Sequence, residues 1–411
     1  MCSAQPLSPL IEHFQSLDDP RCSHLVEHRL LDIIGLTLCA VICGADSWVD
    51  IAAYGRAKEA WLRGFLSLPH GIPSHDTIAR LFAALDSAAS AKEAWLRGFL
   101  SLPHGIPSHD TIARLFAALD SAAFQSCFVA WVKAVAHLGS SEQIAIDGKT
   151  LRHSYDRGGG KGAIHMVSAW ANEQRLVLAQ VKVDEKSNEI TAIPELLKVL
   201  DLQGCLVTID AMGTQTAIAH QIIEGGGDYI LSLKGNQGNI HEDVEQVFTW
   251  ARQQDFKDIS HEFHQTITPG HGRIDIRRHW LLDGVEHLIN AERWVGLKRV
   301  GLVEAERRIL GQPPTIEQRY YLVSFDGDVQ RFAQGVRSHW GIENQLHWVL
   351  DVAFHEDASR IRKDHAPANL AVVRHIALNL LRQDTFAKGG IKAKRLQAGW
   401  DNDYLIRLLS S

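Results

Sequence analysis

The spacing of hydrophobic residues changes near position 140. Before it, apolar residues recur every three or four positions from Leu30 to Cys43 and again from Phe124 to Leu138, which is typical of helices with one buried face. Residues 1–140 are therefore predicted to form a helical N-terminal domain. The apolar run from Ile33 to Ala45 is shorter than the roughly 18 residues that a membrane span needs, so it is predicted to be a buried core helix.

After position 140 the apolar runs are short and rich in β-branched residues, which favours strands. Strands are predicted at 143–147, 165–171, 175–183, 205–210 and 228–233, with helices near 191–200, 214–224 and 238–252. Three strands in succession, followed by alternating helix and strand, fit an α/β fold with an RNase H-like mixed sheet. Alternating runs in residues 255–330 predict a β-rich insertion within this second domain, residues 141–411.

One segment of the N-terminal part is present twice. Residues 57–89 recur letter for letter as residues 91–123, with Ser90 between them. A solenoid needs three or more repeats, so a recent tandem duplication is the simpler explanation. Two identical copies compete for one packing site, and we expect one copy to loop out or to pack elsewhere with apolar side chains exposed.

Each copy also contains a helix that begins after a serine, Ser74 or Ser108. This helix is interpreted in two ways that the sequence leaves open. It is either a recognition helix that presents polar residues to DNA or an ordinary amphipathic helix that packs on the core.

A glutamate stands out in the stretch from Ser338 to Arg362. Glu343 lies in a predicted helix crowded with aromatic and apolar residues, among which Trp340 and Trp348 are interpreted as core residues. Burying an unpaired carboxylate is costly. Glu343 is therefore expected to pair with a cation, to accept several hydrogen bonds or to bind a metal ion.

Two aspartates stand where partners of Glu343 would be expected. Asp147 ends the predicted strand 143–147, and Asp210 ends the predicted strand 205–210. Either aspartate alone could be a turn or helix-capping residue, but the three acids together predict a metal site. Oxygen donors without a matching Cys or His cluster favour Mg²⁺ or Mn²⁺ over zinc. Two such ions could clamp the attacking and leaving oxygens of a phosphoryl transfer.

Three later acids are alternative third ligands: Asp351, Glu356 and Asp357. Asp351 lies eight positions after Glu343, about 80° off its face of an α-helix, and is expected to point elsewhere.

Composition narrows the class of protein. With 45% hydrophobic and 22% charged residues, the chain is an ordinary globular protein, neither disordered nor fibrous. Six cysteines form no CxxC pair or disulfide framework, which suits a reducing cytosol, and no signal peptide is predicted.

The net charge of −6 argues against DNA binding only if charge is evenly spread, and residues 255–411 hold 22 Lys and Arg against 20 Asp and Glu. Candidate phosphate contacts there are Arg273, Arg277, Arg278, Arg293, Lys298, Arg299, Arg307 and Arg308, with a C-terminal cluster of Lys388, Lys392, Lys394 and Arg395.

Several sequence blocks together carry a family resemblance. They are GADSW at Gly44 to Trp48, GIPSHDT at Gly71 to Thr77, AIDGKTLR at Ala145 to Arg152, DEKSNEI at Asp184 to Ile190, TIDAMGTQ at Thr208 to Gln215, LKGNQ at Leu233 to Gln237 and HWGIENQLHWVLDVAFHED at His339 to Asp357. The chain resembles a DDE transposase of the H-repeat-associated type, an insertion-sequence enzyme with an RNase H-like catalytic core. The resemblance implies that Asp147, Asp210 and Glu343 are the catalytic, metal-binding acids that activate water or a DNA 3′-hydroxyl.

The chain departs from the wider transposase superfamily around the glutamate. Where Tyr, Arg, Glu and Lys are often found at fixed spacing, this sequence has Val336, His339, Glu343 and Leu350. A basic residue at the phosphate must therefore come from elsewhere, and Arg337 and Lys234 are candidates.

Other side chains near the predicted site are also candidate DNA contacts. Lys186 is a weaker candidate than Lys234. His339 and His347 flank Glu343 at four-residue spacing; they are interpreted as groups that orient the carboxylate, that contact DNA or that fill the core.

The resemblance also implies partners. They are DNA, as transposon ends and target, and a second copy of the chain, since transposition normally pairs two ends. No membrane partner is expected, and the predicted location is the bacterial cytoplasm, in association with the nucleoid. The family pattern has one copy of the duplicated segment. The alternative function is therefore a catalytically silent DNA-binding remnant that the duplication has impaired.

Overall fold

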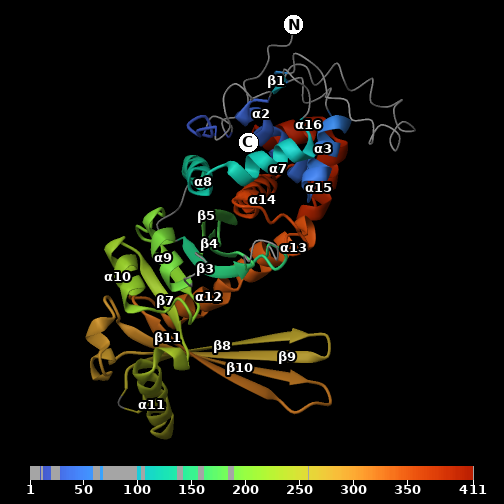
Figure 1. The fold of residues 1–411 in the computed structure, drawn as a ribbon. Coiled ribbons are helices and arrows are strands. Elements are labelled where there is room, and N and C mark those ends of the chain that lie inside the picture. Colours follow the sequence, from blue (N-terminus) through green and yellow to red (C-terminus); the bar gives the residue numbers. More distant parts are fainter. Residues whose placement is uncertain are drawn as a thin grey trace.

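The structure is a computed structural model that describes residues 10, 13–19, 28–58, 65–67, 100–102, 107–136, 142–155, 162–183, 189–257 and 259–410. Helices from both ends of the chain gather at one end of the molecule, a sheet forms its middle, and long strands extend to the other end (Figure 1). Most of the duplicated segment and Lys186 lie outside the described residues.

The sheet has nine strands in the order β5-β4-β3-β6-β7-β11-β10-β9-β8. β3, β6 and β7 are parallel, and the remaining pairings are antiparallel. This confirms the predicted α/β fold with a mixed sheet. The strands are β3 (Gln143–Thr150), β4 (His165–Ala171), β5 (Leu176–Lys182), β6 (Leu206–Ile209), β7 (Asp228–Leu233), β8 (His261–Gly270), β9 (Arg273–Leu282), β10 (Arg299–Ile309) and β11 (Thr315–Val323).

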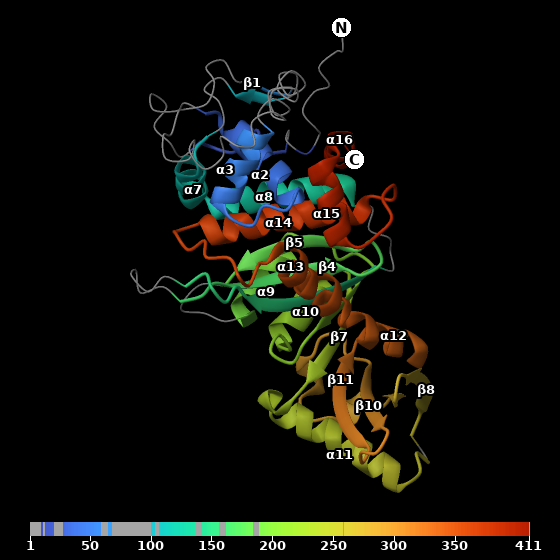
Figure 2. The same ribbon diagram turned by 90° about the vertical axis from the view of Figure 1, so that its right-hand side faces the viewer.

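The predicted β-rich insertion consists of β8 to β11, and it continues the central sheet. β11 pairs antiparallel with β7, with Tyr320 opposite Leu233 and Val323 opposite Ile230. The four strands then run well beyond the edge of the core (Figures 1 and 2). The insertion is thus hydrogen-bonded to the core through β7, a pairing that the alternating pattern of residues 255–330 does not predict.

Helices cover the sheet. α9 (Glu189–Lys198) and α10 (Thr216–Glu224) lie on one face, and α12 (Val329–His339) lies on the other (Figure 1). Gly335 of α12 approaches the sheet so closely that a Cβ there would come within 2.5 Å of Ile230 Cδ1. α11 (Asn239–Gln253) packs on the extension, where the rings of Phe248 and Tyr320 are 5.9 Å apart.

The helical end combines both ends of the chain. Its helices are α2 (Leu30–Ile42), α3 (Trp48–Ala57), α7 (His109–Ala118), α8 (Ser121–Val135), α14 (Ala366–Gln383), α15 (Ile391–Trp400) and α16 (Asn402–Leu409). α14 lies between the N-terminal helices and β5 (Figure 2). Its Asn379 accepts from Val177 N at 2.8 Å and donates to Val177 O at 2.9 Å, which satisfies backbone groups at the sheet edge. The domain boundary at 140 stays a prediction, since helices on both sides of it share one core.

All but one residue of α2 are buried, which confirms the predicted core helix. In the part of the chain that the structure describes, no single helix is long and apolar enough to cross a membrane, although α7 and α8, bent by 90°, would pass that test together.

The packing site of the duplicated segment is filled from both copies. Lys58, at the start of the first copy, donates to Asn402 Oδ1 at 2.8 Å. α7 comes from the second copy, capped by Ser108, and it buries Ile112, Leu115 and Phe116. This burial is what an ordinary amphipathic helix requires, while Arg114 of the same helix is exposed.

The two copies also contact each other. The short strands β1 (Phe65–Ser67) and β2 (Leu100–Leu102), one from each copy, pair in parallel. The helix expected after Ser74 in the first copy lies outside the described residues, as does the predicted looping out of one copy.

Candidate metal centre

Two aspartates lie at the carboxyl ends of neighbouring parallel strands. The last residues that pair between β3 and β6 are Ile146 and Ile209. Asp147 follows Ile146 on β3, and Asp210 follows directly after the end of β6. Sites in open α/β sheets form outside these strand ends. β3 itself continues to Thr150, because its antiparallel pairing with β4 does not stop at Asp147. The predicted strand end at Asp147 was therefore wrong by three residues.

Glu343 reaches this point because α12 is fixed to the sheet beneath it. Gln143 Nε2 donates to Gly335 O at 2.7 Å, and Thr208 Oγ1 is hydrogen-bonded to His339 Nδ1 at 3.0 Å. α12 is followed by a π-helix at Ile342–His347 and by α13 (Trp348–Phe354). π-helical turns are rare in proteins, and those that occur are often found at functional sites.

The π-helical turn directs Glu343 and His347 toward Asp147. His347 Nδ1 lies 3.5 Å from Asp147 Oδ2 and 3.9 Å from Glu343 Oε2. One donor atom from each of these three residues lies within 4.8 Å of the others. Asp210 Oδ1 accepts from the backbone N–H groups of Met212 and Gly213 at 3.0 and 3.2 Å, which fixes the carboxylate and leaves its second oxygen for other partners.

The expectation that Glu343 is a buried carboxylate is wrong, because its side chain is 54% exposed. The apolar residues Ile342 and Leu346 face the core instead. Trp340 and Trp348 are 42% and 61% exposed, so their interpretation as core residues is also wrong. Helical spacing showed an apolar face, but it did not show that these tryptophans lie off that face.

The carboxylate that bears the cost of burial is Asp147. Burial raises its pKa to about 8, and the charge of Glu343 and then those of Asp210 and Glu189 also raise it, while a hydrogen bond from the Gly148 N–H opposes the rise. A divalent cation would favour the ionised form. The donor set of aspartate and glutamate oxygens fits Mg²⁺ or Mn²⁺.

His347 adds a nitrogen donor that the sequence argument did not include. Burial and the nearby Lys149 ammonium lower its pKa to about 3, so the ring is neutral at physiological pH. The position of His347 beside Glu343 agrees with its interpretation as a group that orients this carboxylate. An imidazole ligand would shift the preference from Mg²⁺ toward transition-metal ions such as Mn²⁺.

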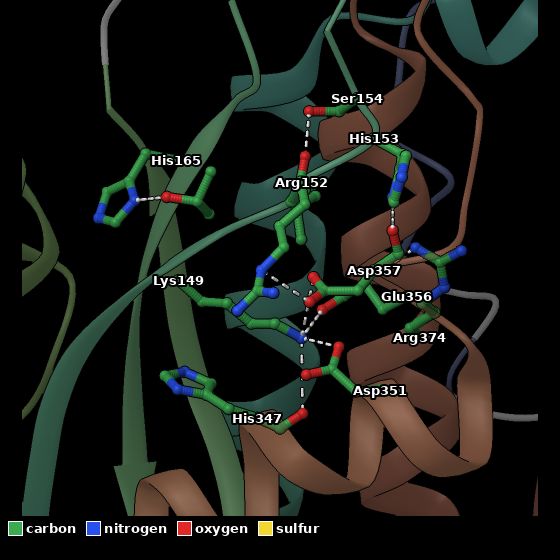
Figure 3. Close-up of polar contacts among 12 residues, drawn as sticks. Lys149, Arg152, His153, Ser154, His165, His347, Asp351, Glu356, Asp357 and Arg374 are labelled. Atoms are coloured by element: carbon green, nitrogen blue, oxygen red, sulfur yellow. Dashed lines mark hydrogen bonds and ion pairs between the residues drawn. The ribbon is translucent and has the colours of Figure 1, made fainter.

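The three alternative acids point elsewhere, toward Lys149 (Figure 3). Lys149 Nζ forms an ion pair with Asp351, lies 2.9 Å from Glu356 Oε2 and is 4.0 Å from Asp357 Oδ1. Although burial raises the pKa of Glu356, Lys149 and Arg374 hold it below its ordinary value. Lys149 was not among the predicted site residues. Its position two residues after Asp147, on the same side of β3, was the available signal.

Lys234, a predicted DNA contact, lies directly before a loop that packs on the loop after Asp210. It is exposed at the end of β7, and the loop that it begins is held on the Asp210 loop. There Asn236 Nδ2 donates to Ala211 O at 2.9 Å, and Gln237 Nε2 donates to Ala211 O and to Thr214 O.

Of the two histidines, His347 is buried and His339 is half-buried. Burial lowers the pKa of His339 to about 4, and its ring is hydrogen-bonded to Thr208. These positions favour orienting or structural roles over direct DNA contact, whereas Arg337 is exposed.

The basic residues of the last third fall into two groups. Most have carboxylate partners: Arg278 with Glu304 and Glu306, Arg299 with Glu262 and Asp283, Arg307 and Arg273 with Asp275, Arg308 with Glu306 and Lys298 with Asp326. Arg277 and Arg337 have no carboxylate at ion-pair distance within the described ranges. Burial and the neighbouring Arg337 lower the pKa of Arg277.

The C-terminal basic cluster divides in the same way. Lys394 and Arg395 are buried. Lys394 donates to Leu381 O at 3.0 Å, and Arg395 donates to Val41 O at 2.7 Å. The expectation that these two residues contact phosphate is wrong, because they hold the C-terminal helices in place. Lys388 and Lys392 are exposed.

Comparisons with known proteins agree with this architecture. The family model described as Transposase DDE domain matches residues 139–380, and the model described as DDE_Tnp_1-associated matches residues 11–90 and again 87–132. The second match covers the second copy of the duplicated segment.

Relatives match almost from end to end. The chain is 38% identical over 408 residues to the H repeat-associated putative transposase YhhI of Escherichia coli (strain K12), covering 98% of each chain. It is 39% identical over 408 residues to the putative transposase YncI of Escherichia coli O157:H7, covering 98% of this chain and 95% of the relative.

Among solved structures, a piggyBac transposase synaptic complex with hairpin DNA aligns over 99% of this chain and 83% of that chain, with a TM-score of 0.41 and 10% identity. That likeness is too distant to support an argument about this chain. The Transposase DDE domain model covers more than half of the sequence, and the H repeat-associated relative is similar over nearly its whole length. The chain therefore belongs to the DDE transposases, with the H repeat-associated proteins.

Proposed function

We propose that this chain is a metal-dependent DNA transposase that cuts DNA at the ends of its own insertion sequence and transfers the strands to a target. Asp147, Asp210 and Glu343 are its catalytic and metal-binding acids. The observation that supports the proposal is that Asp147 and Glu343, from a strand and a π-helical turn, lie close enough to share a metal ion, with Asp210 at the end of the adjacent parallel strand. No Lys or Arg of the described residues is at ion-pair distance from any of them.

Mg²⁺ or Mn²⁺ would be held by Asp147 and Glu343, with Asp210 and His347 beside them. When bound, such ions act as Lewis acids on the phosphoryl oxygens and stabilise the charge of the transition state. The protein supplies the rest. The hydrogen bonds of Thr208 and Gln143 hold α12 on the sheet, which keeps Glu343 over the strand ends.

The DNA would lie across the strand ends and the adjoining face of the extension. Lys234 next to the Asp210 loop, with Arg277 and Arg337, offers positive charge that no carboxylate of the described residues contacts at ion-pair distance. Because phosphate contacts dominate affinity, binding should weaken steeply with salt. A homodimer on DNA is proposed, since two transposon ends are joined in one reaction, and the bacterial cytoplasm with its nucleoid stays the predicted location.

Cleavage of DNA that carries the element's own ends, in Mg²⁺ or Mn²⁺, tests the proposal. Replacement of one acid, in Asp147→Asn, Asp210→Asn or Glu343→Gln, should lower the rate at least about 100-fold, because the metal contribution is several kcal/mol. The exposed Glu195, paired with Lys198, gives a matched control in Glu195→Gln. Cleavage that survives Asp147→Asn would rule out the assignment.

The duplication favours a second candidate function, a DNA-binding remnant without activity. Deletion of residues 57–90 leaves a single copy with an unaltered junction, because Ala91 and Lys92 then follow Arg56 as Ala57 and Lys58 do now. Cleavage by the shortened chain alone would mean that the duplication disables an intact enzyme. DNA binding by both chains with cleavage by neither would favour the remnant.

A further inference from the structure

A buried histidine ring lies beside Asp147 without a hydrogen bond of its own. His347 is 5% exposed, and within the described structure neither nitrogen of its ring is hydrogen-bonded, with Nε2 fully buried. Lys149 Nζ donates to the backbone oxygen of His347 at 3.5 Å and not to the ring (Figure 3). Buried polar groups are nearly always hydrogen-bonded, so a ring without such a partner indicates a ligand from outside the chain.

The ring faces two carboxylates at distances longer than a hydrogen bond. His347 Nδ1 lies 3.5 Å from Asp147 Oδ2 and 3.9 Å from Glu343 Oε2, whereas N–H···O bonds are about 2.7–3.2 Å long. Two donor atoms that are each about 2.1 Å from one ion lie about 3–4 Å apart. The observed separations therefore suit three donor atoms that share an ion, while an orienting role alone would call for a hydrogen bond to one carboxylate.

The closest set of donors at this site contains a nitrogen. Among the described residues, the donor atoms that lie within 4.8 Å of one another come from Asp147, Glu343 and His347, and Asp210 is not in this group. Burial and the Lys149 ammonium lower the pKa of His347, so its ring is neutral and one nitrogen keeps a lone pair. Imidazole suits transition-metal ions, whereas Mg²⁺ prefers oxygen donors and retains several waters.

We propose that His347 Nδ1 is a metal ligand together with the carboxylates of Asp147 and Glu343, and that the site binds transition-metal ions such as Mn²⁺ in preference to Mg²⁺. This inference rests on the proposed metal-dependent function and makes it more specific. Three carboxylates alone would bind either ion, and the histidine nitrogen is what discriminates between them.

Electron spin-echo envelope modulation of Mn²⁺ bound to the full chain without DNA tests the inference. Protein that contains isotope-labelled histidine should show coupling between a histidine nitrogen and the bound ion, which a histidine that only orients a carboxylate does not give. The coupling should disappear in His347→Gln. His220→Gln is the matched control, since it removes an exposed histidine that pairs with Glu224 on α10, and it should keep the coupling.

The affinities for the two ions, measured by isothermal titration calorimetry, give a second readout. His347→Gln should weaken Mn²⁺ binding at least about 10-fold, because the nitrogen ligand is lost, and should change Mg²⁺ binding less than about threefold. His347→Asp supplies an oxygen donor in place of the nitrogen, so it should bind both ions but lose the preference for Mn²⁺.

Thermal melting in EDTA shows whether the variants fold like the wild type. Should His347→Gln melt early, His347→Asp and the spectrum of the wild type test the same ligand. Nitrogen coupling that is absent from the wild type, or that persists in the His347 variants, would overturn the inference. An unchanged ratio of Mn²⁺ to Mg²⁺ affinity in those variants would overturn it as well.

The outcomes also separate this inference from the proposed function. If Asp147→Asn abolishes Mn²⁺ binding and DNA cleavage while the wild type shows no nitrogen coupling, only the histidine ligand is ruled out. If the wild type binds no Mn²⁺ and cuts no DNA with one or two copies of the repeat, both are ruled out.

Discussion

Two groups of acids lie beside β3, and their surroundings are opposite. Asp351, Glu356 and Asp357 surround Lys149 and are further neutralised by Arg152 and Arg374. Asp147, Asp210 and Glu343 have no such partner in the described structure. Charge that is balanced within the protein serves the fold, and charge that is left unbalanced indicates a ligand from outside.

The same distinction separates neighbouring arginines on the extension. Arg278 lies 2.9 and 2.8 Å from the carboxylates of Glu304 and Glu306, whereas Arg277, the preceding residue, faces the opposite side of the sheet near Arg337. One side of β9 is therefore an internal ion-pair network, and the other side offers unmatched positive charge to an anion.

The acids Asp351, Glu356 and Asp357 with Lys149 form the balanced group. The largest expected effect comes from removing the cation of this group. Lys149→Met leaves Glu356, whose side chain is 2% exposed, without its nearest cation, and loss of one partner of a buried ion pair destabilises a fold by about 3–5 kcal/mol. Urea denaturation in EDTA measures this change. Lys198→Met, which breaks an exposed pair, should change stability by less than about 0.5 kcal/mol.

The double variant Lys149→Met with Glu356→Gln should recover part of the loss, because the two residues are coupled. A loss below about 1 kcal/mol in Lys149→Met would contradict the structural role of the balanced group.

The unbalanced group consists of Asp147, Asp210 and Glu343. An added divalent cation should stabilise the protein through this group alone. A divalent ion at 100 times its Kd stabilises the folded state by about 2.7 kcal/mol, so Mn²⁺ should raise the melting temperature and EDTA should reverse the rise. Asp351→Asn should keep this response and Asp147→Asn should lose it. An equal response in both variants would show that Mn²⁺ binds elsewhere.

Asp147 should also destabilise the metal-free protein at high pH. Its folded pKa of about 8 lies above the ordinary value of 3.8, so its contribution to stability is present at low pH and is lost as the pH rises toward 8. Asp147→Asn should therefore stabilise the metal-free chain at pH 8 by about 1–3 kcal/mol and have little effect near pH 4.

Denaturation of both proteins across this pH range measures the difference in their free energies of unfolding. Other buried acids, such as Asp32, whose pKa burial raises to about 7, are present in both proteins, so their effects cancel. A variant that is less stable than the wild type at pH 8 would show that Asp147 serves the fold.

The smallest expected effect is on DNA affinity. Arg277→Gln should weaken binding by about 1 kcal/mol, equally for element ends and unrelated DNA, and should lower the slope of log affinity against log salt by about one. Fluorescence anisotropy over a salt series measures both. Arg278→Gln, the neighbouring substitution in the ion-pair network, should leave the slope unchanged, and equal slopes for the two variants would argue against a phosphate contact at Arg277.

Much of the fold after position 140 could be predicted, because its signals are local. The runs before Asp147 and Asp210 are buried strands, and the alternating insertion is β-rich. The other contacts could not be predicted, because they join residues that are far apart in the sequence. Lys149 meets Glu356 from 207 positions away, Asn369 bonds to Phe116 O from 253 positions away, and the π-helical turn at Glu343 breaks the regular spacing on which the helical interpretation relied.

The way in which the two copies share one packing site has a consequence in genetic terms. The described fold uses the beginning of the first copy and the end of the second, and the copies are identical. Removal of any 34 consecutive residues that starts between positions 57 and 90 therefore restores the same shorter chain. A substitution of an acid such as Asp147 can be reversed only by restoring that one codon. The duplication can be removed at many positions, and every such deletion gives the same protein sequence.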